Sequence, residues 1–334
     1  MRHQLLTSLL RDVSRSFYLT LRVLPTPIRH QIGLAYLLAR ATDTIADSEI
    51  VPVENRLAVL ASLRARILGQ SDQRLSFAEF VPTQSGSAEL LLLERIEEVI
   101  EFLTQQTPAD IQLTRGLLNT ITGGQELDLQ RFGTASKSCI IGLSSWSELD
   151  DYTYRVAGCV GEFWTECCLN HLPNAPIDRR VELLENGVRF GKGLQLTNIL
   201  RDLPKDLRLG RCYLPSEELS QHGLSPEDLL EPANFGRFAD YFGTMLDRAE
   251  AELLAGWEYS NSIPRSWVRV RLACAWPVLI GLSTLEKLRR SNVLEVDKRI
   301  KVSRNEVRTI LLKTICLYPF PRAWRGLGGA MKSR

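Results

Sequence analysis

The stretch that decides the fold runs from Leu194 to Pro215 and reads LQLTNILRDLPKDLRLGRCYLP. Asp202 and Asp206 stand four residues apart, so both carboxylates project from one face of a helix, about one turn apart. Like charges at this spacing oppose helix formation by about 0.2–0.5 kcal/mol, and Pro204 removes a backbone donor between them. A hard divalent cation such as Mg²⁺, which takes oxygen ligands and bridges carboxylates to substrate phosphates, would offset that cost.

Basic side chains accompany this acidic pair and offer positive charge to the oxygens of a diphosphate. They are Arg201, Lys205, Arg208 and Arg211. For one such motif standing alone, a solvated and charged helix end with no ligand is the alternative interpretation.

The same pattern occurs a second time, in the upstream segment YLLARATDTIADSE. Asp43 and Asp47 again stand four residues apart, and Arg40 precedes the first acid by about one turn. Two acidic pairs on separate apolar helices suit a cavity in which facing helices hold a metal and a diphosphate.

The composition is that of an ordinary soluble globular chain. Its 334 residues suffice for one large helical domain or two smaller ones, and 44% are hydrophobic and 24% charged. A net charge of +2 gives no global attraction to nucleic acid, so no nucleic-acid partner is expected. The seven cysteines show no CxxC pair, which indicates reduced, mostly buried thiols in a cytoplasmic protein.

Neither a secretory signal nor a membrane span is expected. The apolar part of MRHQLLTSLLRDVSRS is too short for a signal, and no apolar run approaches the ~18 residues of a span. The segment from Tyr318 to Arg334 mixes aromatic and aliphatic side chains with arginine and lysine. This mixture fits peripheral contact with an anionic membrane surface, and it fits an ordinary frayed terminus equally well.

Helix-start signals are frequent, and strand-like alternation is scarce. Proline follows a capping residue at Thr26, Thr107 and Ser225, and capping boxes are expected at Ser225 and Ser303. The pattern predicts an all-α protein with a surface loop over residues 69–87, and helices over residues 4–20, 27–48, 54–69, 87–104, 108–122, 124–133, 147–170, 178–203, 226–258, 265–291 and 303–316. We expect a single all-helical domain over residues 1–316 and a C-terminal tail over residues 317–334.

Together these motifs resemble those of the squalene and phytoene synthase family, the head-to-head isoprenoid synthases. The similarity runs from SRSF at Ser14–Phe17 to KVSR at Lys301–Arg304, and it includes the segments GGQELDL, DYTYRVAGCVGE and GRCYLP. The central segment is similar to a family pattern of the form YxxxVAGxVG. The resemblance implies an all-α, single-domain isoprenoid synthase fold whose helices surround a central cavity. In that cavity two aspartate-rich motifs face one another, and Mg²⁺ ions hold prenyl diphosphates.

Residue roles are implied by position in the resemblance. The implied metal ligands are Asp43, Asp47, Asp202, Asp206 and Asn198. The implied substrate contacts are Ser14, Arg15, Phe17, Arg40, Asn198, Arg201 and Arg211. The implied catalytic residues are Tyr154, which would assist the rearrangement, Tyr36 and Arg40. The implied nicotinamide contacts are Arg15, Arg40, Arg201, Lys301 and Arg304.

Aromatic rings at Phe17, Tyr36 and Tyr154 would steady cationic carbons through their faces, an effect of about 0.5–2 kcal/mol each. A buried tyrosine that is hydrogen-bonded for structural reasons is the competing account. Two positions depart from the family pattern. Ala46 stands where animal squalene synthases tend to carry a further acid, so that extra metal contact is not expected. Arg155 replaces the tyrosine sometimes found directly before VAG.

The primary hypothesis is a squalene synthase, a Mg²⁺-dependent farnesyl-diphosphate farnesyltransferase that serves sterol or hopanoid synthesis. It would join two farnesyl diphosphates through presqualene diphosphate and reduce the product with NADPH. The segment KRIKVSR carries the basic residues Lys298, Arg299, Lys301 and Arg304, and it resembles the stretch with which squalene synthases contact the NADPH phosphate. The same segment also suits a helix start with solvated lysines.

Three alternatives stay open at this point. The first is a phytoene or dehydrosqualene synthase, which loses a proton instead of taking up hydride and needs no reductant. Hydroxysqualene formation is the second. The third is a non-catalytic helical protein that binds prenyl diphosphates or a partner subunit. We expect a monomer or a homodimer, located in the cytoplasm with at most peripheral membrane association.

Overall fold

A computed structural model of the chain describes residues 8–14, 17–48, 51–77, 88–295 and 300–329. Helices make up almost all of the regular structure in this part of the chain, so the all-α prediction is confirmed. The chain divides into two compact units, the first formed by Met1–Gly133 and Phe163–Ala175 and the second by Thr134–Glu162 and Pro176–Arg334. The grouping into a single domain stays a prediction.

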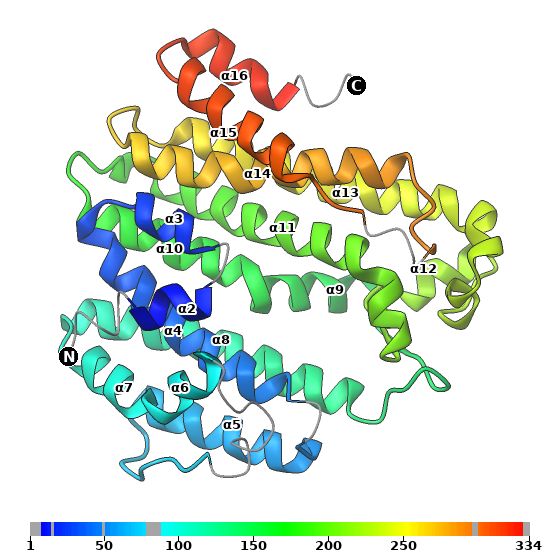
Figure 1. Cartoon of the computed structure of the whole chain (residues 1–334), viewed down its shortest axis with the longest axis horizontal. Helices are drawn as coiled ribbons and strands as arrows, with labels where there is room; N and C mark the ends of the chain where they lie inside the picture. The colour runs from blue at the N-terminus through cyan, green and yellow to red at the C-terminus, as the bar shows by residue number, and fades with distance from the viewer. Residues whose placement is uncertain (1–7, 15–16, 49–50, 78–87, 296–299, 330–334) are drawn as a thin grey trace. The chain divides into compact units, whose positions relative to one another are not determined.

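The first unit is built around α4 (Thr26–Ala46) and α8 (Pro108–Phe132), which pack against each other and, with α5 (Val53–Leu68), lie side by side (Figure 1). On α4, the buried residues Leu34, Leu38, Ala41 and Ile45 form the apolar stripe expected of a core-facing helix. The polar residues of the acidic motif therefore share a different stripe of the same helix. The remaining helices of this unit are α2 (Leu10–Ser14), α3 (Phe17–Val23), α6 (Ala88–Glu94), α7 (Ile96–Thr104) and the last part of α10 (Cys159–His171).

Helix α8 is continuous, so the prediction of two helices separated near Gly123 is wrong. A glycine inside a helix costs only about 0.5–1 kcal/mol relative to alanine, and α8 packs against both α4 and α5 over this region. The predicted start is confirmed, since the hydroxyl of Thr107 accepts a hydrogen bond from the backbone N–H of Asp110 at 3.2 Å. An unbroken α8 holds the GGQELDL segment at fixed helical spacing.

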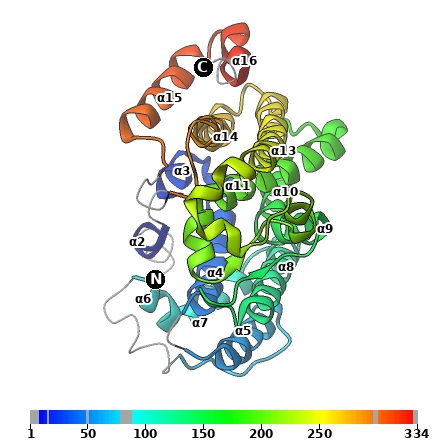
Figure 2. The same ribbon diagram turned by 90° about the vertical axis from the view of Figure 1, so that its right-hand side faces the viewer.

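The second unit is organised around α11 (Arg180–Arg208), which packs against α13 (Phe235–Ser262) and α14 (Val268–Arg289) (Figure 2). The parallel pair of short strands β1 (Ile141–Gly142) and β2 (Arg211–Cys212) also belongs to this unit. The other elements are α9 (Trp146–Thr153), the π-helix η3 (Tyr154–Gly158), the first part of α10, the 3₁₀ turns η4 (Ile177–Arg179), η5 (Glu227–Leu230) and η6 (Pro232–Asn234), α12 (Ser216–Gln221), α15 (Arg304–Leu317) and α16 (Pro321–Gly329).

Helix α11 continues through Pro204, so the predicted end at residue 203 is wrong. Proline removes one backbone hydrogen bond from the helix, but Leu200, Leu203 and Leu207 bury their side chains along this stretch and hold it in place. The helix ends just before Gly210, whose positive φ of 80° is a conformation that favours glycine. Asp202 and Asp206 consequently lie on one continuous helix.

Other predicted boundaries also change. The predicted helix over 226–258 begins with the turns η5 and η6 and becomes regular only in α13, and residues 88–104 form two short helices. The segment that the sequence analysis set apart as a C-terminal tail contains α16, whose Trp324 is buried and stacks on Trp257 with ring centroids 5.5 Å apart. Helix α14 has the length and hydropathy of a membrane span, but 61% of that stretch is buried inside the fold, as in a core helix.

Glycines allow η3 and the start of α10 to lie directly on α11. A Cβ on Gly161 would meet the carbonyl oxygen of Gly187 at 1.9 Å, and one on Gly191 would meet that of Ala157 at 2.1 Å. Backbone atoms cannot move aside as a flexible side chain can. The VAGCVGE segment is therefore fixed against α11 by backbone packing.

We predict that Gly161→Ala lowers the free energy of unfolding by about 1–3 kcal/mol, because overpacking forces two helix backbones apart. Gly243→Ala on α13 is the matched control, since nothing lies within 4 Å of an added Cβ there. The control should raise stability by about 0.5–1 kcal/mol through helix propensity. Urea unfolding followed by circular dichroism measures both, and equal effects of the two substitutions would contradict the close packing.

Candidate functional site

The first acidic motif lies on α4 of the first unit. The carboxylate of Asp43 accepts a hydrogen bond from Nε2 of Gln125 on α8, with 2.5 Å between the nitrogen and Oδ1. Burial raises the pKa of Asp43 to about 6, the charge of Asp47 adds to this rise, and Arg40 and Gln125 partly offset it. Asp47, one turn further along, is exposed. An acid that resists ionisation beside a second acid is a place where a bound cation would be stabilising.

Arg40 and Tyr36 precede Asp43 on the same stripe of α4. Nη2 of Arg40 donates to Oε1 of Glu89 on α6 at 2.9 Å, while its Nε is buried without a hydrogen-bond partner among the described residues. The hydroxyl of Tyr36 donates to the carbonyl oxygen of Val13 on α2, a long contact of 3.4 Å. Glu89 thus holds Nη2 of the Arg40 guanidinium, while the neighbouring Nε–H on the same edge has no partner among the described residues.

Several buried polar atoms around α4 share this lack of a partner among the described residues. They are Ser14 Oγ on α2, Gln31 Oε1, Arg40 Nε and Ser48 Oγ on or next to α4, and Gln125 Oε1 on α8. Buried polar atoms are hydrogen-bonded in most native proteins, and an exception needs an explanation such as a ligand, an ion or a water molecule. The group includes Ser14 and Arg40, two residues that the sequence analysis assigned to substrate binding.

The second acidic motif lies on α11 of the second unit. Asn198, Asp202 and Asp206 follow one another at four-residue steps and share one helix face. Arg201 binds Asp202 in a bidentate pair, with Nε to Oδ1 at 2.9 Å and Nη2 to Oδ2 at 2.5 Å. This hydrogen bond raises the pKa of Arg201. The two acidic motifs belong to different units, and their convergence on one ligand stays a prediction.

Tyr154 begins the π-helix η3, a kind of helix that often occurs at functional sites. Its hydroxyl donates to Oε2 of Glu162 at 3.0 Å, and burial, together with this acid, raises the pKa of Tyr154 to about 12. The Nζ of Lys192 lies 5.9 Å from the centre of the Tyr154 ring and pairs with Oδ1 of Asp150 at 2.7 Å. The phenol is therefore neutral near pH 7, and its proton is directed at a carboxylate.

Tyr152 was missed by the sequence analysis, although the spacing pointed to it. In a pattern of the form YxxxVAGxVG the tyrosine stands four residues before the valine, and Tyr152 occupies that position before Val156. Its ring stacks on Tyr213, with centroids 4.6 Å apart and an interplanar angle of 26°. Tyr213 belongs to the GRCYLP segment, so two of the segments that carry the resemblance meet within the second unit.

Two further residues of the first unit were also missed. Gln125 lies inside the quoted GGQELDL segment, but its partner Asp43 is 82 positions away and no local pattern connects them. Glu89, the partner of Arg40, carries no motif signal. In the second unit, Glu162, the hydrogen-bond partner of Tyr154, is the last residue of the quoted segment DYTYRVAGCVGE. Lys192, which lies near the Tyr154 ring, belongs to no sequence motif.

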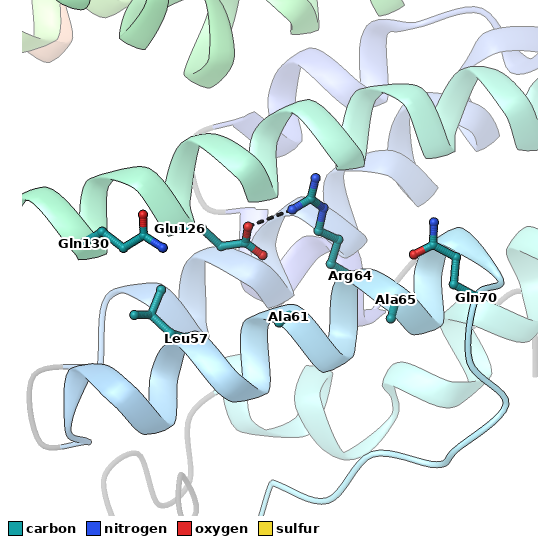
Figure 3. Close-up of a pocket in the computed structure, with 7 residues that line it drawn as sticks. All are labelled: Leu57, Ala61, Arg64, Ala65, Gln70, Glu126 and Gln130. Carbon is teal, nitrogen blue, oxygen red and sulfur yellow. Dashed lines mark hydrogen bonds and ion pairs between the residues drawn. The ribbon is translucent and has the colours of Figure 1, made fainter.

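Gln125 and Glu126 follow one another on α8 but contact two different helices, since a helix turns by about 100° per residue. Gln125 contacts Asp43, whereas Glu126 pairs with Arg64 of α5 at 2.7 Å. Figure 3 shows Arg64 and Glu126 in a groove of about 390 Å³ that is lined by Leu57, Ala61, Arg64, Ala65, Gln70, Glu126 and Gln130. The two charged residues that line the groove, Arg64 and Glu126, are thus paired with each other, and Arg64 also donates a hydrogen bond to Asn119 at 2.7 Å.

The remaining predicted site residues are placed as follows. Arg15 lies outside the described residues, and so does the side chain of Phe17, whose backbone begins α3. Arg211 is in β2. Lys301 and Arg304 are exposed, and Lys298 and Arg299 lie outside the described residues. The capping box between Ser303 and Glu306 is confirmed, so a helix start accounts for part of the basic segment.

The donor chemistry of both motifs fits Mg²⁺. All the candidate ligands offer oxygen, which Mg²⁺ prefers. Among the described residues no group of three or more His, Cys, Asp and Glu side chains is arranged to hold a metal. Mg²⁺ commonly binds through one or two carboxylates and completes its shell with water and substrate phosphates.

Comparisons with known proteins point in the same direction. A family model described as squalene/phytoene synthase matches residues 10–306. The bifunctional lycopene cyclase/phytoene synthase of Gibberella fujikuroi is 30% identical over 243 residues, which are 72% of this chain and 40% of that protein. This chain thus spans less than half the length of that relative. The presqualene diphosphate synthase of Rhodopseudomonas palustris is 30% identical over 254 residues, or 76% of this chain and 77% of that protein.

The fold has a close counterpart among solved structures. TcSQS in complex with the ligand E5700 aligns with a TM-score of 0.76 at 20% sequence identity, covering 99% of this chain and 98% of that one. At this level of identity the likeness concerns the fold.

We predict that Asp43→Asn makes the metal-free protein more stable at neutral pH. The folded pKa of about 6 exceeds the ordinary value of 3.8, so the folded state binds more protons between these two values. The resulting stabilisation is complete below about pH 4 and is lost as the pH rises through 6. Asparagine does not ionise, so the variant avoids this loss of stability. Its free energy of unfolding at pH 7 should exceed that of the parent by on the order of 2–3 kcal/mol.

Urea unfolding of both proteins between pH 4 and 7.5 measures this difference, which should shrink towards pH 4. Asp178→Asn, at an exposed carboxylate, is the control and should change stability by less than about 0.5 kcal/mol. An Asp43→Asn protein that is less stable than the parent at pH 7 contradicts the predicted charge strain.

We further predict that Gln125→Met raises the pKa of Asp43 above its present value, because the side chain that donates to the carboxylate is lost. Carbon-13 NMR of the aspartate carboxyl groups follows that titration directly. Gln130→Met on the same helix is the control, since Gln130 is exposed and lines the groove between α8 and α5. An unchanged titration in the Gln125 variant would show that the amide does not stabilise the ionised acid.

Proposed function

The chain belongs to the squalene/phytoene synthase family, and from that premise we propose that it is a Mg²⁺-dependent prenyltransferase. It joins two farnesyl diphosphates head to head through presqualene diphosphate. The observation that carries this proposal is the stripe on α4, where a buried acid of raised pKa lies among buried polar atoms that have no partner in the described structure. The family match over residues 10–306 and the relative named presqualene diphosphate synthase support it.

The first chemical step is the loss of diphosphate, which leaves an allylic cation. Mg²⁺, when bound, would neutralise the negative charge that develops on the leaving group. Each acidic pair, Asp43 with Asp47 and Asp202 with Asp206, would hold such an ion, with Asn198 as a further oxygen donor. Members of the family depend on divalent metal ions of this kind.

Arginine side chains bind the diphosphate directly in this proposal. The Nε of Arg40 is a buried donor without a partner among the described residues, and Glu89 holds the neighbouring Nη2. Arg201 is held by Asp202 through two hydrogen bonds. Guanidinium groups fixed before the substrate arrives stabilise developing negative charge without further reorganisation.

Closure of the cyclopropane ring in presqualene diphosphate releases a proton, and we assign the transfer of this proton to Tyr154. With a pKa of about 12 the phenol stays protonated near neutral pH, so it does not act as a phenolate base. It can accept a proton on its oxygen while its own proton passes to Glu162, 3.0 Å away. The rings of Tyr152 and Tyr154 would also stabilise the carbocation, by about 0.5–2 kcal/mol each.

The fate of presqualene diphosphate is the finer part of the proposal. Reduction by NADPH to squalene is the first candidate, supported by the exposed basic side chains of Lys301 and Arg304. A product formed without reductant is the second candidate, either by proton loss to a polyene or by release of presqualene diphosphate. It is supported by two relatives, one named bifunctional lycopene cyclase/phytoene synthase and the other presqualene diphosphate synthase.

Purified protein incubated with farnesyl diphosphate and Mg²⁺, with and without NADPH, tests the proposal. Mass spectrometry of the extracted products should show presqualene diphosphate or a hydrocarbon derived from it, and chelation of the metal should stop turnover. Asp43→Asn and Asp202→Asn should each reduce turnover by about a hundredfold or more, in line with the loss of charge stabilisation in other active sites. Farnesyl diphosphate that stays intact would refute the proposal.

The same incubations decide the finer point. Squalene that appears only with NADPH identifies the reductive reaction, whereas an unchanged product with and without NADPH identifies the non-reductive one. Geranylgeranyl diphosphate in a parallel incubation tests the chain length of the substrate.

A further inference from the structure

The outer side of α15 and the turn that follows it expose large apolar side chains. Leu312 is 63% exposed, Ile315 is 51% exposed and Phe320 is 61% exposed. Leu312 and Ile315 are three residues apart and share one face of α15. We call Leu312, Ile315 and Phe320 the apolar face.

Buried side chains and hydrogen bonds join α15 and the turn that follows it to the rest of the second unit. Within α15, Ile310 and Thr314 are buried, and the Thr314 hydroxyl accepts a hydrogen bond from Nε1 of Trp276 at 2.9 Å. The hydroxyl of Tyr318 donates to the carbonyl oxygen of Arg265 at 2.7 Å, which joins the end of α15 to the start of α14. In α16, Trp324 is buried. The exposed apolar side chains therefore stand on a packed support and do not belong to a frayed end.

The segment that carries the apolar face is almost entirely positive in charge. Between residues 300 and 329, Glu306 is the only acidic residue in the sequence, and its carboxylate is paired with Lys287 at 2.7 Å. The exposed basic residues of this segment and of the start of α14 are Arg265, Arg269, Lys301, Arg304, Arg308, Lys313, Arg322 and Arg325. Aliphatic and aromatic side chains flanked by long cations are typical of a helix that lies at a membrane interface.

We propose that the apolar face docks on an anionic lipid membrane. Leu312, Ile315 and Phe320 would enter the boundary between headgroups and acyl chains, and the neighbouring arginines and lysines would pair with lipid phosphates. The scarcity of acidic side chains favours a surface of uniform negative charge. This inference goes beyond the proposed function and holds whichever product the protein makes.

Flotation of the full-length protein with lipid vesicles tests the proposal. The protein should float with vesicles that contain about one-third phosphatidylglycerol, bind neutral phosphatidylcholine vesicles about tenfold less, and be released from the anionic vesicles by high salt. A triple variant with Leu312→Ser, Ile315→Ser and Phe320→Ser should bind the anionic vesicles about tenfold more weakly. Circular dichroism and thermal unfolding verify that this variant is folded.

The matched control carries Ile177→Ser and Val181→Ser, two side chains that are 59% and 69% exposed elsewhere in the second unit. Its vesicle binding should equal that of the parent. A parent protein that stays with neither kind of vesicle, or that binds both equally, overturns the proposal. Equal loss of binding in the triple variant and in the control also overturns it, as does retention on an acidic protein column but not on anionic vesicles.

Discussion

The constraint on which the candidate site depends is the carboxylate of Asp43, largely removed from water and placed one turn from a second acid. Its pKa of about 6 means that burial disfavours the charged form, and the neighbouring Asp47 adds to that effect. The charge of Arg40 and the hydrogen bond from Gln125 work in the opposite direction. A sequence selected for stability alone would not keep such a pair, because buried charge without a full set of partners is unfavourable. The arrangement makes physical sense when an added positive charge completes it.

The scaffold shows how such strain is tolerated. On α4 an apolar stripe is buried in the core and a separate stripe carries Tyr36, Arg40, Asp43 and Asp47. The packing that stabilises the helix is thus independent of the polar side chains. On α11 the buried leucines on either side of Pro204 carry the helix past a residue that would end an isolated one. In both helices, tertiary burial holds in place an acidic pair that local energetics oppose.

These two helices also show how far the sequence leads. Periodic apolar residues place α4, α5, α14 and α15 within a few residues, and paired aspartates at helical spacing identify both motifs. The continuity of α8 and α11 escapes such reasoning, since local glycine and proline penalties of at most a few kcal/mol are smaller than the stabilisation from burial. Partners such as Gln125 for Asp43 and Glu89 for Arg40 escape it too, because they are distant in sequence and follow no repeat. Tyr152 is different: its place in the YxxxVAGxVG spacing can be read from the sequence, whereas its stacking on Tyr213 cannot.

Tyr154 and Asp43 illustrate one principle at work in both units. Each is a titratable group whose neutral form is favoured by burial, and each is given a specific polar partner, Glu162 in one case and Gln125 in the other. For the phenol, the partner accepts a proton, so the neutral group can pass a proton on without ever becoming phenolate. For the acid, the partner donates, so the ionised form is available as soon as a cation arrives. A reaction that must bind diphosphate through metal and then handle a carbocation away from water needs both kinds of group. In this chain burial favours the neutral form of both groups, and their hydrogen bonds run in opposite directions: Tyr154 donates to Glu162, whereas Asp43 accepts from Gln125.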